Sequence, residues 1–189
     1  MIICGIDEAG RGPLAGPVYA AAVILGDDFK CDILNDSKKL SAAKREQAER
    51  IIYSGALAWG VGWATHEEID RINILQASLL AMKRAFEEML KRKNLSPEKF
   101  SVIVDGLHVP DISAPCRAMV KADAQIHEVM AASILAKTAR DHFMNEMSLL
   151  YPQYGYEKHK GYPTKAHREL ILKYGPSPIQ RMSFRVGNN

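Results

Sequence analysis

The sequence IICGIDEAGRG at residues 2–12 combines a short apolar run with two acids and a glycine-rich turn. The apolar part, Ile2 to Ile6, has the length and composition of a buried β-strand. Asp7 and Glu8 follow at once, and adjacent carboxylates repel one another unless a cation joins them. The Gly-Arg-Gly turn lets backbone N–H groups approach a ligand oxygen closely. The stretch therefore predicts a strand that leads into a site for a divalent metal and a phosphate-bearing partner.

The composition is that of one well-packed domain. The chain has 189 residues, of which 47% are hydrophobic, so it can bury a sizeable core and is not expected to be disordered. The formal net charge is +3 and the pI is near 8.7. This mild basicity is compatible with a nucleic-acid partner and equally with an ordinary protein surface.

Cysteine usage and the N-terminal sequence both indicate a cytoplasmic protein. Cys4, Cys31 and Cys116 are isolated and form no C-x-x-C pair, which argues against a zinc cage or a disulfide framework. The N-terminus lacks a basic segment followed by an apolar one. The longest apolar stretch, near Pro13 to Leu25, contains two prolines and is too short to span a membrane. We therefore expect a soluble, cytoplasmic protein without a membrane partner.

Hydrophobic periodicity predicts alternating strands and helices, and hence an α/β layer with a mixed sheet. Thr65 and Glu68 form a capping-box pattern that marks a helix start, and the tail after Pro178 is expected to fray. No linker or repeat divides the chain. The expected strands are Ile2–Ile6, Val18–Leu25, Ala56–Ala64, Phe100–Val104 and Arg117–Val120; the expected helices are Ala42–Tyr53, Leu75–Lys93, Val129–Leu149 and Lys165–Lys173.

Three of the predicted strands lead into an aspartate: Asp7, Asp105 and Asp123. An acid at a strand end is usually only a turn or cap residue. The carboxyl ends of strands in an α/β sheet nevertheless gather at one edge, where ligands bind. The coincidence of several such acids with the doubled acid and the Gly-Arg-Gly turn therefore predicts that the three side chains converge.

Six motifs, taken together, resemble the ribonuclease HII family, the type 2 ribonucleases H. They occur in family order between Cys4 and Phe184, nearly the whole chain. The resemblance implies a ribonuclease H-like fold: a five-stranded mixed sheet flanked by helices, with a C-terminal extension at about 150–189 of a single domain, 1–189. The motifs are GIDEAGRGPLAGPV at 5–18, NDSKKLS at 35–41, VDG at 104–106, KAD at 121–123, AASILAK at 131–137 and HKGYPT at 159–164.

The resemblance also implies an activity and its residues. The family cleaves the RNA strand of RNA–DNA hybrids and incises at single ribonucleotides embedded in duplex DNA. Carried over by motif, the catalytic and metal-binding acids are Asp7, Glu8, Asp105 and Asp123. The implied substrate-binding residues have three roles. Gly10, Arg11 and Gly12 would read the ribose 2′-OH, and Tyr162 would stack on the following deoxyribose. Ser37 and Lys39 belong to a family motif and would contact phosphate.

A two-metal hydrolysis fits these residues. Two Mg²⁺ or Mn²⁺ ions about 4 Å apart would clamp the attacking and leaving oxygens, with Asp7 as the bridging ligand. Oxygen ligands suit these ions, and no His or Cys pair suggests zinc. The family implies products with 5′-phosphate and 3′-hydroxyl ends. Further candidates for phosphate contact are Lys137, Lys160, Lys165 and His159, although each is by default an ordinary surface residue.

Alternatives and departures from the family pattern remain. A structure-selective DNA nuclease on the same fold would need the acids but not the 2′-OH reader. A non-catalytic hybrid-binding module is disfavoured because all four acids are present. A nucleotide-binding phosphotransferase is disfavoured because Gly-Arg-Gly lacks the G-K-[ST] ending of a P-loop. Ala122, Gln125 and Gln180 stand where many members have a glycine, a basic residue and a histidine. We expect a monomer whose partner is nucleic acid.

Overall fold

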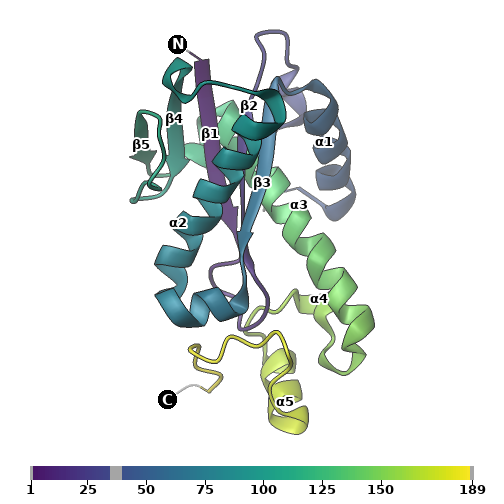
Figure 1. Cartoon of the computed structure of the whole chain (residues 1–189). Coiled ribbons are helices and arrows are strands. Elements are labelled where there is room, and N and C mark those ends of the chain that lie inside the picture. Colours follow the sequence, from purple (N-terminus) through teal and green to yellow (C-terminus); the bar gives the residue numbers. More distant parts are fainter. Residues whose placement is uncertain (1, 35–39, 188–189) are drawn as a thin grey trace.

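The computed structural model describes residues 2–34 and 40–187, and its centre is a five-stranded mixed sheet (Figure 1). The strand order is β3-β2-β1-β4-β5; β2 is antiparallel to β1 and β3, whereas β4 is parallel to β1 and β5. The predicted mixed sheet is therefore confirmed. The strands are β1 (Ile2–Ala9), β2 (Val18–Ile24), β3 (Ala58–Ala64), β4 (Phe100–Asp105) and β5 (Cys116–Met119).

Helices cover both faces of the sheet (Figure 1). Helix α2 lies on one face, and α1 and α3 lie on the other. The α-helices are α1 (Ala42–Gly55), α2 (His66–Lys93), α3 (His127–Leu150), α4 (Tyr156–His159) and α5 (Lys165–Tyr174). Short 3-10 turns are η1 (Cys31–Ile33), η2 (Pro97–Lys99), η3 (Ala122–Ala124) and η4 (Pro152–Tyr154).

Strand β2 shows why the layers pack closely. Its residues alternate between the two cores, so Ala20 and Ala22 face α2 whereas Ala21 and Val23 face α1 and α3. These small side chains are fully buried and let helices approach from both sides. The three cysteines are free thiols; Cys4 is buried, whereas Cys31 and Cys116 are only partly buried. Among the described residues, no helix is both long enough and apolar enough to cross a membrane.

Helix α2 joins two helical segments that the sequence shows separately. The predicted capping box is present: Thr65 Oγ1 accepts from the Glu68 N–H, and Glu68 accepts from the Thr65 N–H. Asn73 then breaks the helical geometry with a φ of 67°, and its side chain accepts from the Leu75 N–H at 2.9 Å. The helix start predicted at Leu75 is thus a second N-terminus inside α2.

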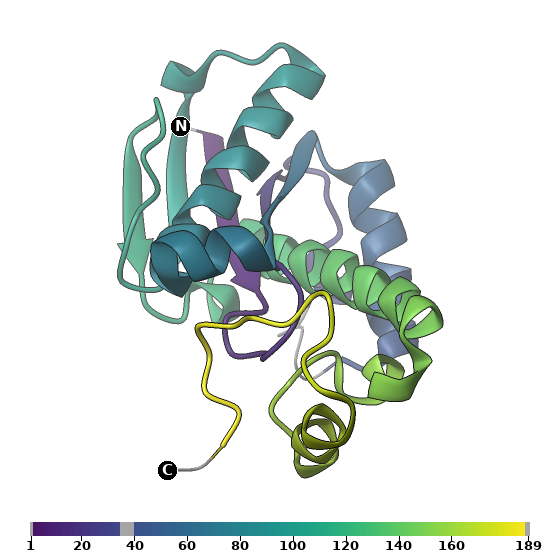
Figure 2. The same cartoon turned by 60° about the horizontal axis from the view of Figure 1, so that its bottom comes forward.

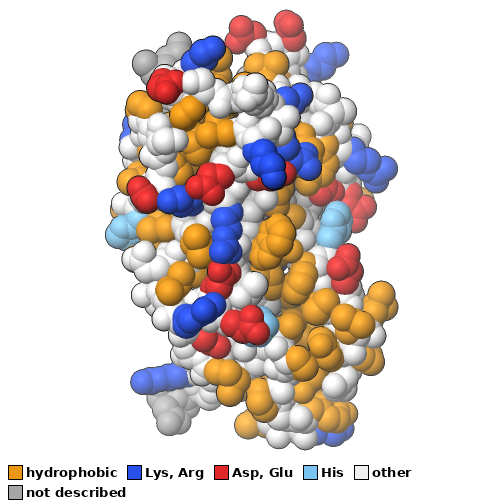
Figure 3. All heavy atoms as spheres, in the orientation of Figure 1, with side chains coloured by type: hydrophobic (Ala, Val, Ile, Leu, Met, Phe, Trp, Pro, Cys, Tyr) orange, Lys and Arg blue, Asp and Glu red, His pale blue; other side chains and the backbone are white. Residues whose placement is uncertain are grey.

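The C-terminal elements pack against the end of α3, and the tail runs beside the loop that follows β1 (Figure 2). The expectation that the tail frays is wrong for its central part, because Ile179, Gln180 and Arg181 are buried. Exposed apolar side chains gather on α5 and the end of α3, towards the lower right of Figure 3. They include Leu149, Leu150, Leu172 and Tyr174.

Candidate metal and substrate site

Three aspartates meet at the carboxyl end of the parallel strands. In the β1–β4 register Ile6 pairs with Val104, so Asp7 and Asp105 lie side by side. Asp123 comes from η3, just beyond β5. One oxygen of each carboxylate lies within 4.8 Å of the others, which confirms the predicted convergence.

Two details of that prediction are corrected. Asp7 lies inside β1, which continues to Ala9, rather than just after the strand. Asp123 lies in a 3-10 turn that Lys121 begins in a left-handed conformation, with a φ of 58°. The turn brings Asp123 back over the sheet edge, a change of direction that an extended strand could not make.

Hydrogen bonds orient the carboxylates of Asp7 and Asp105. Asp7 Oδ1 accepts from the Glu8 N–H at 2.7 Å, and the buried Ser133 hydroxyl of α3 donates to the same carboxylate. Asp105 Oδ1 accepts from the Ala122 N–H at 2.8 Å, which ties η3 to β4. Helix α3 can come this close because Gly5 has no side chain; a Cβ there would lie 2.2 Å from the Glu128 carbonyl carbon.

The site is electrostatically unfavourable without a cation. Burial raises the pKa of Asp7 well above its ordinary range, and the neighbouring charges of Glu8 and Asp105 raise it further. Three converging carboxylates provide hard oxygen ligands and no nitrogen or sulfur. Such a donor set fits Mg²⁺ or Mn²⁺ and would lower its own repulsion by binding one.

Glu8 is not a member of this group of three. Consecutive strand residues direct their side chains to opposite faces, so Glu8 and Asp7 diverge. Glu8 Oε1 lies 3.4 Å from Arg11 Nη1, whereas Glu8 Oε2 is buried and has no hydrogen-bond partner among the described residues. Burial raises the pKa of Glu8, and Arg11 opposes that rise. An unpartnered buried carboxylate oxygen is itself suited to a cation.

The Gly-Arg-Gly turn and Tyr162 come together, although about 150 residues separate them in the sequence. A Cβ on Gly12 would lie 4.0 Å from Tyr162 Cε1, and the Leu14 N–H donates to the Gly161 carbonyl at 2.8 Å. The Tyr162 side chain is 39% exposed, and Arg11 lies on the surface. A ligand can therefore reach both at once.

Two stacked histidines support the Tyr162 loop from below. The rings of His159 and His167 lie 4.3 Å apart with an interplanar angle of 19°. His159 Nδ1 accepts from the Gly161 N–H, so its Nε2 carries the proton and donates to the Tyr154 carbonyl at 2.9 Å. Both ring nitrogens are thus engaged inside the protein, and the suggestion that His159 contacts phosphate is wrong.

His167 completes this support. Its Nδ1 donates to the Tyr162 carbonyl at 3.0 Å, and its Nε2 is buried without a partner among the described residues. The side chain is fully buried, and burial lowers the pKa of His167 to about 4. The neutral ring therefore holds Tyr162 in place at neutral pH.

The candidate lysines differ in their surroundings. Lys137 Nζ lies 2.5 Å from Asp141 Oδ1 and 6.0 Å from the centre of the Tyr162 ring, beside the site. Lys160 donates to Asn145 and to the Glu157 carbonyl. Lys165 is 91% exposed next to Glu169. Ser37 and Lys39 lie outside the described residues.

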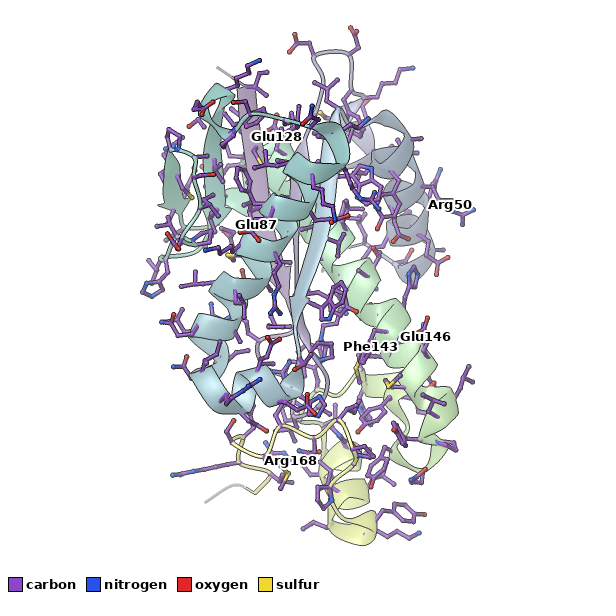
Figure 4. All side chains as sticks on the ribbon, in the orientation of Figure 1. Arg50, Glu87, Glu128, Phe143, Glu146 and Arg168 are labelled. Carbon is purple, nitrogen blue, oxygen red and sulfur yellow. The ribbon has the colours of Figure 1, made fainter. Side chains whose placement is uncertain are left out.

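Sequence reasoning did not find Ser133, Arg140 and Arg181, which are all buried near the site. Arg140 follows the small residues Ala132 and Ala136 at helical spacing, which was the available signal. A hollow of about 710 Å³ beside β3 and α2 contains none of the three aspartates. Its lining includes Trp59 and Glu87, and Glu87 is labelled on α2 in Figure 4.

Comparisons with known proteins agree with this geometry. A family model described as Ribonuclease HII matches residues 4–186. The ribonuclease HII of Treponema denticola is 56% identical over 197 aligned positions, covering 99% of this chain and all of the relative. The solved ribonuclease H2 of Pyrococcus horikoshii is 26% identical, with a TM-score of 0.75 over 98% of this chain and 95% of that chain. A Bst-RNase HIII solved in complex with Mn²⁺ shares the fold at 18% identity, with a TM-score of 0.76 over 97% of this chain and 67% of that one.

Proposed function

This chain belongs to the ribonuclease HII family, and from that premise we propose that it incises duplex DNA on the 5′ side of single embedded ribonucleotides. Its general activity is that of a metal-dependent endoribonuclease on RNA–DNA hybrids. The observation that carries the proposal is the group of three carboxylates, whose oxygens lie within 4.8 Å of one another beside a glycine turn and a partly exposed tyrosine.

The metal ligands proposed are Asp7, Asp105 and Asp123, with Glu8 as a fourth acid. When bound, two divalent cations, Mg²⁺ or Mn²⁺, supply the positive charge that activates water and stabilises the leaving 3′-oxygen, giving 5′-phosphate and 3′-hydroxyl ends. The raised pKa of Asp7 supports this assignment, and so does Glu8 Oε2, which has no hydrogen-bond partner in the described part of the chain; a bound cation would stabilise both carboxylates. Ser133 and Glu8 N–H hold the Asp7 carboxylate ready for this role.

Ribose recognition is assigned to the Gly10–Arg11–Gly12 turn and to Tyr162. A 2′-hydroxyl distinguishes RNA from DNA at a single position, and backbone groups without side chains can reach it. The ring of Tyr162 offers a flat face to a sugar without a 2′-oxygen. The closeness of Gly12 to Tyr162 supports the reading of a ribose and its 3′ neighbour together.

The remaining assignments follow the same division. We propose that residues 1–189 act as one domain, with about 150–189 as an extension that contacts substrate; its position against the loop after β1 supports this. Ser37 and Lys39 stay proposed phosphate contacts on the strength of their motif alone.

The test uses a labelled DNA duplex with one ribonucleotide, beside an all-DNA duplex and an RNA–DNA hybrid of the same sequence. Wild-type protein should incise 5′ of the ribonucleotide in Mg²⁺ or Mn²⁺ and not in chelator. Asp7→Asn should lose this incision while it keeps the native circular dichroism spectrum. Asp28→Asn, the same chemical change at an exposed position between β2 and α1, serves as the matched control.

Each other outcome leads to a different assignment. Cleavage of the hybrid alone would keep the endoribonuclease and remove the junction-sensing role of Tyr162. Cleavage of all-DNA duplexes would favour a structure-selective DNA nuclease. Binding without any cleavage would favour a non-catalytic module, and full activity of Asp7→Asn would refute the metal assignment.

A further inference from the structure

Arg181 of the C-terminal tail is fully buried against the loop that carries the Gly-Arg-Gly turn. Its guanidinium donates to backbone carbonyl oxygens only, and all of them belong to that loop. The acceptors are the carbonyls of Gly10 at 2.6 Å, Arg11 at 3.0 Å, Pro13 at 2.9 Å, Gly16 at 2.8 Å and Pro17 at 3.1 Å.

A second buried guanidinium lies beside it. Arg140 of α3 donates to the carbonyls of Pro17 at 3.0 Å and Ala15 at 3.1 Å, and its Nη1 is buried without a partner among the described residues. In the described part of the chain, neither guanidinium forms an ion pair with an Asp or Glu. Two buried positive charges thus lie under one loop, where carbonyl dipoles and the rings of Tyr162 and Phe184 face them.

The tail is held so that Arg181 reaches this place. The Asp70 carboxylate of α2 accepts from the N–H groups of Met182 and Ser183, both at 2.9 Å. The Arg181 N–H donates to the Leu14 carbonyl at 2.8 Å. Farther along, Arg168 of α5, labelled in Figure 4, donates to the Val186 carbonyl. The chain is therefore anchored at Arg181 itself and at the residues that follow it.

This arrangement determines the shape of the turn. Because a peptide group is planar, a carbonyl that is held towards the guanidinium also fixes the N–H of the next residue, which points in the opposite direction. A rigid guanidinium with five N–H donors can hold several carbonyls at once in this orientation. A buried, unpaired charge is a costly way to gain stability alone, since an apolar side chain of similar size usually packs at lower cost.

We propose that Arg181 is a positioning residue for ribose recognition: it holds the Gly10–Gly12 turn in the conformation that meets a 2′-hydroxyl. The proposal rests on the proposed function, because that function assigns the turn to the ribose. It adds that the C-terminal tail, more than 160 residues away in the sequence, sets the discrimination between ribose and deoxyribose. The two buried charges also make the underside of the turn electropositive, which favours a phosphate beside it.

The test compares wild type with Arg181→Lys, which keeps the charge and loses the planar fork. Binding to a duplex with one ribonucleotide and to the same all-DNA duplex is measured by fluorescence anisotropy, with Ca²⁺ in place of Mg²⁺ to slow cleavage. The ratio of the two dissociation constants should fall about tenfold in the variant, a change of roughly 1.4 kcal/mol. An unchanged ratio would overturn the proposal.

Arg84→Lys is the matched control, because Arg84 is also held by a carbonyl and by a carboxylate, those of Trp63 and Glu68, away from the turn. Hydrogen exchange of peptides covering residues 10–17 gives a readout besides binding. Exchange there should quicken in Arg181→Lys and stay at the wild-type rate in Arg84→Lys. Equal exchange in all three proteins would also overturn the proposal.

Failure of the proposed function is distinguishable from failure of this inference. A wild type that binds both duplexes equally would refute ribose reading, and the exchange data would still decide whether Arg181 holds the turn. Should Arg181→Lys not fold, Asp70→Asn carries both measurements, since it weakens the anchor of Met182 and Ser183 without touching the guanidinium. A wild-type ratio and wild-type exchange in that variant count against the proposal.

Discussion

The stability of this protein should depend on pH through His167 beneath Tyr162. The side chain is fully buried and donates from Nδ1 to the Tyr162 carbonyl, and within residues 2–34 and 40–187 its Nε2 has no hydrogen-bond partner that could accept a second proton. Burial is the largest cause that lowers the pKa of His167, from 6.5 to about 4. When folding lowers the pKa of a histidine, the protein is most stable at pH values above the unfolded-state pKa. Stability is then lost as the pH falls from the unfolded-state pKa towards the folded-state pKa.

The magnitude follows from the shift. The shift of roughly 2.5 in pKa lowers the free energy of unfolding by about 3.4 kcal/mol once the pH lies well below the folded-state pKa. Between about pH 7.5 and about pH 4.5 the loss is about 2.5 kcal/mol. His167→Asn keeps a donor near the Nδ1 position and cannot gain this charge. The variant should be less stable than wild type at neutral pH, and the difference should shrink or reverse at the lower pH.

Urea unfolding at the two pH values, without divalent metal, measures this difference. Buried acids such as Asp7 titrate in the opposite sense, but they are present in both proteins and cancel in the comparison. His108→Gln serves as the control, because the His108 side chain is exposed and should leave the wild-type pH dependence unchanged. Parallel pH profiles for wild type and His167→Asn would refute the reasoning.

Three further changes test other parts of the site. Asp7→Asn should raise the free energy of unfolding at neutral pH in the absence of metal, because a buried carboxylate with a raised pKa destabilises the fold at any pH above its ordinary pKa. The variant should also lose Mn²⁺ binding in calorimetry. A less stable variant would contradict this account. Gly10→Ala should destabilise the protein by about 2 kcal/mol or more, since its φ is 101° and its Cβ would lie 2.2 Å from Arg140 Nε; an unchanged melting temperature would be inconsistent with the loop geometry. Gln180→Met should raise the free energy of unfolding by about 1 kcal/mol, because both amide atoms of Gln180 are buried without partners in the described structure. A lower free energy of unfolding in urea would indicate that these atoms form hydrogen bonds.

Much of the fold and of the metal site could be predicted because the determining signals are local. Runs of apolar residues and the Thr65 capping box mark where strands and helices begin, and a few residues suffice to read them. The convergence of Asp7 and Asp105 follows from the strand pattern, since parallel strands bring their carboxyl ends to one edge, whereas Asp123 also needs the turn that Lys121 begins. These parts of the prediction needed no knowledge of the strand register.

What only the tertiary structure decided depends on partners far apart in the chain. The stacking of His159 on His167 and the burial of Arg181 arise from contacts that no local pattern encodes. A basic tail is ordinarily solvated, and its arginine is buried here because a loop 164 to 171 residues earlier presents five carbonyls to it. The sequence by itself thus determined the elements and the acids at their ends, whereas the packing of distant loops determined the shape of the turn beside them, because hydrogen-bond acceptors become partners only once the chain has folded.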